Sequence, residues 1–252
     1  MISAAERFDL SGKVALITGG SRGLGRAMAL AFAGAGADLV IARRKLDACQ
    51  RTAAEVEALG RRALPVACHV GEWDQVDALV ETAYAHFGAL DILVNNAGMS
   101  PHYASLPEVT EVLWDKVLAV NLKGAFRLTA LVGTRMAAGG GGSIINISSI
   151  VAIRPTVWEV PYAAAKAGLN ALTEAFAQAL GPTVRVNCIQ AGPISTDISK
   201  TWAPEFVERM QQAIALKRMG RAEEIVGAAL YFASAASSFT SGAILRVDGG
   251  HA

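Results

Sequence analysis

The chain has few cysteines, and their arrangement excludes several classes of protein. Its 252 residues include three cysteines, Cys49, Cys68 and Cys188, which are far apart and odd in number. No CxxC pair and no Cys/His spacing typical of a metal site occurs. We therefore expect reduced thiols, no disulfide framework and no metal site, as in intracellular proteins.

An excess of charge of one sign and long apolar runs are also missing. The 23 lysines and arginines nearly balance the 22 acidic residues, for a net charge of +1, so we expect no nucleic acid as partner. The most apolar stretch, residues 27–37, is far shorter than the roughly 20 residues that cross a bilayer. Residues 1–13 lack the apolar centre of a signal peptide. We expect a soluble, cytoplasmic protein without a membrane partner.

The chain does contain a regular alternation of short β-branched runs and longer helical patterns, and 52% of its residues are apolar. Continuous apolar strands between helices indicate an α/β protein whose parallel sheet is covered on both faces. No linker or repeat interrupts the pattern, so we expect one doubly wound domain over residues 1–252. The expected strands are 14–18, 39–42, 63–68, 92–95, 143–147, 184–189 and 243–247, and the expected helices are 24–34, 46–59, 73–87, 111–137, 161–180 and 222–234.

A glycine-rich turn joins the first expected strand to the first helix, with the spacing G-x-x-x-G-x-G over residues 19–25. Such a pattern can be merely a tight turn. However, a strand before it and a helix after it are the context in which helix amides face a pyrophosphate, so we expect a Rossmann-type dinucleotide site. The candidate residues are Gly19, Ser21, Arg22, Gly23, Leu24 and Gly25.

The end of the second strand favours one cofactor over another. A site for NAD(H) usually has a carboxylate about 20 residues after the glycines. This chain has Arg43 and Arg44 there instead, and guanidinium groups suit the extra phosphate of NADP(H). We predict NADP(H), with NAD(H) as the alternative; a merely solvated basic patch is the structural alternative.

Tyr162 and Lys166 are four residues apart within an expected helix, so they share one face. A nearby ammonium lowers the pKa of a phenol, which then becomes a usable proton donor and acceptor. Taken alone, the pair could equally be a tyrosine packed on a lysine stem.

With these motifs in view, the chain resembles the classical short-chain dehydrogenases/reductases over essentially its full length. The resemblance rests on the glycine turn, on Tyr162 and Lys166, and on four further segments: Asn95–Gly98, Val120–Lys123, Asn146–Ser149 and Val247–Gly250. It implies a catalytic set of Asn121, Ser149, Tyr162 and Lys166. It also implies that Tyr162, Lys166, His69, Val70, Asn95, Ala97, Gly98, Ile194 and Thr196 belong to the cofactor site.

The resemblance also implies a role for each catalytic residue. Tyr162 exchanges the proton with the substrate oxygen, and Ser149 hydrogen-bonds that oxygen. Lys166 lowers the pKa of Tyr162 and binds the nicotinamide ribose, while Asn121 holds a water that connects Lys166 to solvent.

Two positions depart from the family pattern. His69-Val70 replaces the usual Asp-Val after the third strand, which puts an adenine contact by a side chain in doubt and leaves the Val70 backbone as an alternative. Ala191-Gly192 replaces the usual Pro-Gly after the sixth strand, which loosens that turn.

The substrate is expected to be a small ketone or secondary alcohol, enclosed by segments 99–106 and 150–161 and by a lid over about 197–216. Trp202 and the stripe Phe206, Met210 and Ile214 would give the lid an apolar inner face, and Glu159 could bind a polar group. A 3-oxoacyl thioester reductase, a sugar-nucleotide epimerase or dehydratase, and a non-catalytic dinucleotide sensor are the alternatives. By analogy with the family we expect a homo-oligomer, a dimer or a homotetramer, that uses helices 111–137 and 161–180.

Overall fold

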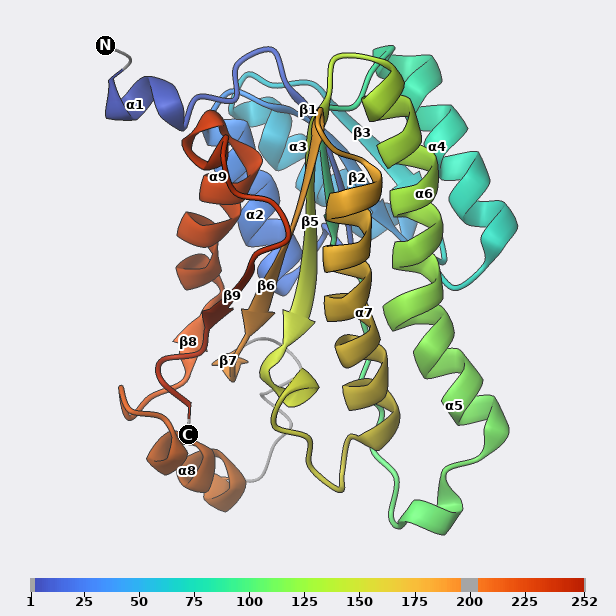
Figure 1. Cartoon of the computed structure of the whole chain (residues 1–252), viewed down its shortest axis with the longest axis vertical. Helices are drawn as coiled ribbons and strands as arrows, with labels where there is room; N and C mark the ends of the chain where they lie inside the picture. The colour runs from blue at the N-terminus through green and yellow to red at the C-terminus, as the bar shows by residue number, and fades with distance from the viewer. Residues whose placement is uncertain (1–2, 196–203, 252) are drawn as a thin grey trace.

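A seven-stranded parallel sheet forms the centre of the molecule in this computed structural model, which describes residues 3–195 and 204–251 (Figure 1). The strands lie in the order β3-β2-β1-β4-β5-β6-β9. Their bounds are β1 Val14–Thr18, β2 Asp38–Arg43, β3 Ala63–Ala67, β4 Ile92–Asn95, β5 Gly142–Ser149, β6 Val184–Ala191 and β9 Ile244–Val247.

Helices cover both faces of this sheet. The helices on one face are α2 Gly23–Gly34, α3 Leu46–Ala58 and α9 Val226–Ala233, and those on the other are α4 Trp73–Phe87, α6 Gly124–Ala138 and α7 Val160–Ala179. The other α-helices of the described residues are α1 Ala4–Arg7, α5 Glu111–Leu118 and α8 Pro204–Ala213.

The continuous apolar strands are explained by these two helical layers. Successive side chains of a strand point to opposite faces, so a strand that is covered twice needs apolar residues at every position. In β1, Ala15 and Ile17 pack into the core beneath α2, whereas Leu16 packs into the core beneath α4 and α6. The predicted fold class, a doubly wound α/β sheet of seven parallel strands, is confirmed.

The structure also contains features that the sequence pattern did not predict. The expected helix 111–137 is interrupted by one turn of π-helix, Ala119–Lys123, between α5 and α6. A separate two-stranded sheet pairs β7, Ile194–Ser195, with β8, Gly220–Arg221. Two-residue strands carry too little alternation to be recognised in a sequence.

The helical stretch Glu111–Ala138 is long and apolar enough to cross a membrane when judged by length and composition alone. However, 44% of its apolar window is buried inside the molecule, where α6 packs on β4, β5 and α4. Such packing is typical of a core helix in an α/β protein, which makes the membrane interpretation weak.

The sheet order places a crevice at its carboxyl edge. Because β1 lies between β2 and β4, the chain leaves β1 toward one side and returns to β4 on the other. Ligands of open α/β sheets bind at this reversal, outside the carboxyl ends of the strands.

One close helix contact at this edge gives a test of the packing. A β-carbon on Gly124 would lie 2.2 Å from the carbonyl oxygen of Val70, a backbone atom that cannot easily move away. We expect Gly124→Ala to lower the free energy of unfolding by about 1–3 kcal/mol, as overpacking does. Gly227→Ala in α9 is the matched control, because nothing lies within 4 Å of its β-carbon position. Alanine is the better helix former, so the control should gain about 0.5–1 kcal/mol. Urea denaturation measures both, and equal effects would contradict the packing described.

Candidate functional site

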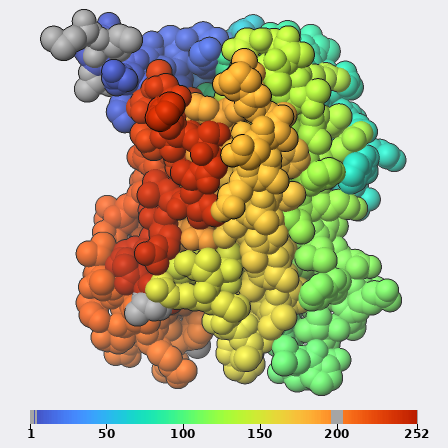
Figure 2. Space-filling model, in the orientation of Figure 1, coloured from blue at the N-terminus to red at the C-terminus, as the bar shows by residue number. Residues whose placement is uncertain are grey.

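A cleft of about 1010 Å³ lies at the carboxyl ends of β1, β4, β5 and β6. In Figure 2 the yellow segment after β5, the orange α8 and the red carboxyl terminus meet at this end of the molecule. The cleft contains both a glycine turn and the tyrosine–lysine pair, which are about 140 residues apart in sequence.

The glycine turn is packed so closely that side chains do not fit. A β-carbon on Gly25 would lie 2.3 Å from the Gly19 carbonyl oxygen, and Gly19 itself has a φ of 65°. Helix α2 begins at Gly23, and no side chain of the described residues caps it. Its first-turn amides therefore remain available to an anion, and Gly19, Arg22, Gly23, Leu24 and Gly25 all line the cleft as predicted.

Three guanidinium groups gather beside this turn. Arg43 Nη1 donates to Ser21 Oγ at 3.2 Å, and Ser21 supports Arg43 rather than lining the cleft itself. Burial lowers the pKa of Arg43, and the positive charges of Arg22 and Arg44 lower it further. Within the described residues no ion pair includes any of the three arginines, so their charge remains available to a phosphate.

The segment after β4 fastens the glycine turn. Thr18 Oγ1 accepts from the amides of Asn96 and Ala97 at 3.0 and 3.1 Å, and Asn96 Nδ2 donates to the Thr18 carbonyl at 2.8 Å. Ala97 and Gly98 line the cleft as predicted, and so does Asn96, which the prediction omitted.

Asn95, in contrast, does not line the cleft, and its predicted role in cofactor binding stays a prediction. Its side chain is 3% exposed and donates to Thr129 Oγ1 at 3.0 Å and to Asn146 Oδ1 at 2.9 Å. Because alternate residues of a strand face opposite ways, Asn95 joins β4 to β5 and α6, and Asn96 takes the outward position.

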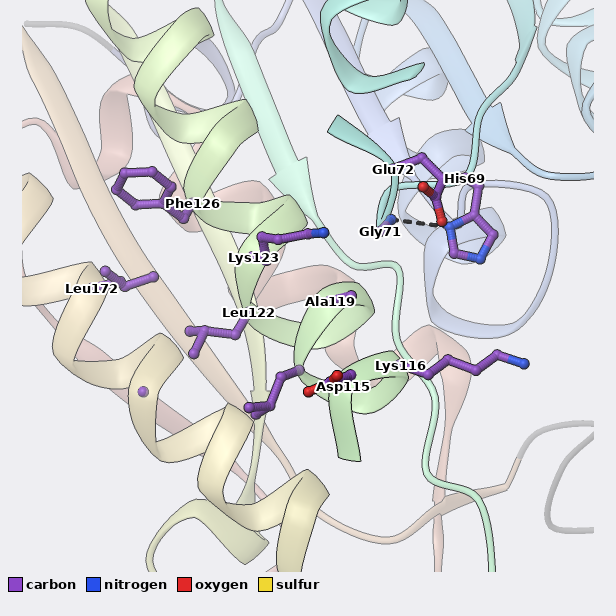
Figure 3. Close-up of a pocket in the computed structure, with 12 residues that line it drawn as sticks. His69, Gly71, Glu72, Asp115, Lys116, Ala119, Leu122, Lys123, Phe126 and Leu172 are labelled. Atoms are coloured by element: carbon purple, nitrogen blue, oxygen red, sulfur yellow. Dashed lines mark hydrogen bonds between the residues drawn. The ribbon is translucent and has the colours of Figure 1, made fainter. Parts of the chain in front are cut away.

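His69 and Val70 follow β3 and line the cleft. The amide of Gly71 donates to His69 Nδ1 at 3.1 Å, a bond drawn in Figure 3, and this fixes the imidazole ring. The His69 amide in turn donates to Gln75 Oε1 at 2.8 Å. Both residues thus line the part of the cleft that lies at the end of β3, and their contact with adenine stays a prediction.

At the opposite end of the cleft, Ser149, Tyr162 and Lys166 are brought together by β5 and α7. The Ser149 hydroxyl lies close enough to the Tyr162 phenol to lower its pKa. Lys166 Nζ lies 5.5 Å from the centroid of the Tyr162 ring and donates to the carbonyl oxygen of Ile147 at 2.7 Å. The i,i+4 spacing therefore produces the expected proximity, at the end of β5 that carries the serine.

The pKa of Tyr162 moves in the direction opposite to the one predicted. Burial raises it to about 12, the nearby Ser149 hydroxyl lowers it, and the negative charge of Glu159 raises it. Burial also lowers the pKa of Lys166, to about 8, because charging an ammonium inside a protein costs free energy. The prediction that Lys166 lowers the pKa of Tyr162 is wrong for this state of the protein, in which the Lys166 ammonium donates to a backbone carbonyl.

Asn121 lies in the π-helical turn and is 1% exposed. Its Nδ2 donates to the carbonyls of Met99 and Val117 at 2.8 and 2.9 Å, and its Oδ1 accepts from the Met99 amide at 3.2 Å. Asn121 thus holds the segment that follows Gly98 in place. A β-carbon on Gly98 would lie 2.9 Å from Asn121 Oδ1 and 3.6 Å from Lys166 Nζ, so Gly98 lies between these two side chains and close to both.

The substrate end of the cleft includes one face of α8. Phe206, Arg209 and Met210 line it, as does Ile194 from β7. Ile214 belongs to another environment: it is 1% exposed and pairs with His251, so the predicted apolar stripe divides between the cleft and the core. Thr196, Trp202 and the first part of the expected lid lie outside the described residues.

Other lining residues belong to the segments 99–106 and 150–161, which were predicted to enclose the substrate, but were not singled out individually. Arg154 donates to the carbonyl oxygen of His251, which links the segment after β5 to the carboxyl terminus. His102 and Tyr103 reach the cleft from the loop after β4. No local pattern marks these residues, because only the folded chain brings the three segments together.

The chain has extensive similarity to known proteins. The family model described as enoyl-(acyl carrier protein) reductase matches residues 19–252. Dehydrogenase/reductase SDR family member 4 of Bos taurus is 38% identical over 98% of this chain and 89% of its own length. The 3-oxoacyl-(acyl-carrier-protein) reductase FabG of Thermotoga maritima is 37% identical over 96% of this chain and 98% of its own. The solved structure of a 7α-hydroxysteroid dehydrogenase, complexed with NADH and 7-oxo glycochenodeoxycholic acid, matches with a TM-score of 0.95 and 34% identity. It covers 100% of this chain and 98% of its own.

The buried ammonium of Lys166 predicts a measurable cost in stability. Its pKa is about 8 in the folded protein against an ordinary value of 10.5, so between these pH values only the unfolded chain holds the proton, and stability rises with pH. At pH 7 the folded protein bears the full cost. At this pH we expect Lys166→Met to raise the free energy of unfolding by about 1–3 kcal/mol. This value already subtracts the stabilisation that the hydrogen bond to Ile147 gives the wild-type protein.

Urea denaturation of the cofactor-free protein at a series of pH values measures this gain. The gain should shrink as the pH rises from about 8 to about 10.5, because the wild-type lysine then loses its proton. Lys45→Met, at the residue before α3, is the control, because that side chain is exposed to water and its removal should change stability little. A destabilised Lys166→Met protein at pH 7 would show that the ammonium is not under strain.

Proposed function

Since the chain belongs to the classical short-chain dehydrogenase/reductase family and is an oxidoreductase, we propose that it transfers a hydride between NADP(H) and a ketone or secondary alcohol. The observation that carries the proposal is the meeting of Ser149, Tyr162 and the buried Lys166 ammonium at the wall of one cleft.

Each residue has a defined task in this reaction. The nicotinamide supplies or accepts the hydride when it is bound. With a pKa of about 12, Tyr162 holds its proton at neutral pH, so it can donate to the oxygen of a ketone that is being reduced. Ser149 lies near Tyr162 and can donate a hydrogen bond to the same substrate oxygen, which stabilises the developing negative charge. Lys166 keeps a positive charge close by, and Asn121 positions the chain around Gly98; a water held by Asn121 remains part of the proposal.

The preference for NADP(H) is supported by the arginine cluster. Arg22, Arg43 and Arg44 lie near one another without a carboxylate partner among the described residues, as a site for a phosphate ester requires. The related hydroxysteroid dehydrogenase was solved with NADH, so an NAD(H)-dependent enzyme is the alternative. The cofactor contacts of Gly19, Gly23, Leu24, Gly25, Val70, Ala97 and Ile194 belong to this proposal as well.

Two alternative functions, a 3-oxoacyl thioester reductase and a non-catalytic dinucleotide sensor, can be compared with these findings. Reduction of a 3-oxoacyl thioester is favoured by the Thermotoga maritima relative, a 3-oxoacyl-(acyl-carrier-protein) reductase. A non-catalytic dinucleotide sensor is opposed by the assembly of Ser149, Tyr162 and Lys166 in one place. A cytoplasmic location stays a prediction.

We also propose that the protein is a homo-oligomer that associates through α5, α6 and α7. A hollow of about 940 Å³ on this side is lined by Leu122, Phe126 and Leu172, which Figure 3 shows on adjoining helices. Phe126 and Trp114 are 40% and 38% exposed, and Val112 is 77% exposed. A second copy would remove this apolar surface from water, as in symmetric dimers and tetramers.

Removal of the Tyr162 hydroxyl tests the reaction. We expect Tyr162→Phe to lower kcat by at least about 100-fold in ketone reduction, because it loses the proton donor. NADPH should still bind, which quenching of protein fluorescence measures. Tyr84→Phe is the control, because the Tyr84 hydroxyl has no hydrogen-bond partner among the described residues. Normal activity of Tyr162→Phe would refute the proposed acid.

Removal of the two arginines tests the choice of cofactor. The Arg43→Ala/Arg44→Ala double variant should weaken NADPH binding by about 10–100-fold and NADH binding much less, because charged hydrogen bonds to a phosphate contribute roughly 1.5–3 kcal/mol. The control is Arg51→Ala, whose guanidinium pairs with Asp47 on the exposed side of α3. Equal weakening of both cofactors would mean that the arginines do not recognise the 2′-phosphate.

A further inference from the structure

The segment just before α7 is held rigidly against the cleft by one hydroxyl group. Tyr103 Oη donates to the carbonyl oxygen of Val157 at 2.7 Å and accepts from the amide of Val160 at 2.9 Å. These two bonds enclose Trp158 and Glu159, and both of those residues line the cleft. The segment is therefore built to present an indole and a carboxylate to the substrate.

The Glu159 carboxylate has little to compensate its charge. Its one hydrogen bond among the described residues comes from Thr156 Oγ1 at a long 3.5 Å, and no described lysine or arginine forms an ion pair with it. Burial accordingly raises its pKa, against the hydrogen bond from Thr156 and the nearby His102. A partly buried carboxylate without a cation is costly for a folded protein, and a cationic ligand would remove that cost.

Glu159 also lies next to the reacting groups. It precedes Tyr162 by three residues at the first turn of α7, and its charge is felt at the phenol, whose pKa it raises. Because residues three apart at the start of a helix lie on neighbouring positions, and both line the same cleft, one molecule can extend from the phenol to the carboxylate. Beside it, Trp158 is 59% exposed, and an indole face next to a carboxylate suits an ammonium group.

His102 lies near enough to lower the pKa of Glu159, but no charged side chain at this end of the cleft forms an ion pair with Glu159 among the described residues. Arg154 is committed to the carbonyl oxygen of His251. Arg209 has no ion-pair partner among the described residues, but it is exposed on α8, at the opposite wall. An exposed guanidinium is solvated by water, whereas the Glu159 carboxylate is partly removed from water. A substrate charge is therefore more strongly favoured beside Glu159 than beside Arg209.

We propose that the substrate of this site carries a protonated amine near its carbonyl or alcohol carbon, with the ammonium bound by Glu159 and placed against Trp158. This inference rests on the proposed function, because it assigns the substrate class of the same cleft. Selection depends on the charge of the substrate, while Ser149 and Tyr162 act on its oxygen.

A matched set of cyclic ketones tests the inference with NADPH. The set contains N-methyl-4-piperidone, which is mostly protonated at pH 7, and three carbocyclic analogues: 4-methylcyclohexanone, 4-hydroxycyclohexanone and 4-oxocyclohexanecarboxylate. We expect kcat/KM for the ammonium ketone to exceed that for the methyl analogue by at least about 10-fold, and the carboxylate to be the poorest. The preference should fall as the pH rises and the amine of the substrate loses its proton.

Two variants connect the preference to the proposed residues. Glu159→Gln should bring the ratio of kcat/KM between the ammonium and methyl ketones to within about 3-fold, and Trp158→Leu should reduce it by a smaller factor. The ratio is the informative quantity, because a change in the shared proton and hydride steps affects both ketones alike. Glu174→Gln, on an exposed position of α7, is the control and should retain the wild-type ratio.

The outcomes separate the inference from the proposed function. Reduction of the methyl ketone without preference for the ammonium ketone would overturn the inference and leave the proposed reaction intact. A preference for the hydroxyl ketone would mean that Glu159 accepts a neutral hydrogen bond. A preference for the carboxylate would make Arg209 the recognition residue, and either result rejects the amine. Reduction of no ketone, with NADPH bound, would contradict the proposed reaction and the inference with it.

Discussion

The burial of the Lys166 ammonium is the constraint on which the site depends. The residue is 3% exposed, and its ammonium donates to the carbonyl oxygen of Ile147. The backbone carbonyl of Lys166 accepts a hydrogen bond from Ser148 Oγ at 3.1 Å. These bonds fix α7 on β5 in one register, and that register brings Tyr162 to Ser149. The protein thus keeps the Lys166 ammonium in a buried position that is unfavourable for charge, and the bonds at this position hold Tyr162 next to Ser149.

The two ends of the cleft are connected by the segment that follows β4. At the glycine turn, Asn96 and Ala97 bind Thr18 at the end of β1. One residue further, Gly98 passes close to Lys166 and to Asn121, and Asn121 holds Met99 from both sides. A displacement of this segment would therefore disturb the phosphate end and the reacting end together. The π-helical turn that contains Asn121 is consistent with a helix that departs from regular geometry to make these contacts.

Sequence patterns predicted much of the fold and the reacting residues, for physical reasons. Continuous apolar strands and the glycine turn are local signals, and the i,i+4 spacing placed Tyr162 and Lys166 correctly. A four-residue strand does not show which of two adjacent asparagines faces outward, so Asn95 was named as a candidate and Asn96, which lines the cleft, was not. The raised pKa of Tyr162 was not predicted, since burial and the direction of the Lys166 ammonium are properties of the folded chain. The segments that contain Arg154 and Tyr103 were predicted to enclose the substrate, but the hydrogen bonds of these two residues could not be found, because their partners are distant in sequence.

The distribution of charge along the cleft suggests how one cavity can distinguish two ligands. Arginines and a free helix amino terminus occupy the end where the glycines lie, so that end favours an anion. The other end contains a carboxylate without a cationic partner among the described residues, beside an exposed indole. A molecule with a phosphate and a molecule with an ammonium would each be attracted to one end and disfavoured at the other. The tyrosine and serine lie beside the carboxylate, so a substrate held there has its oxygen within reach of both hydroxyl groups.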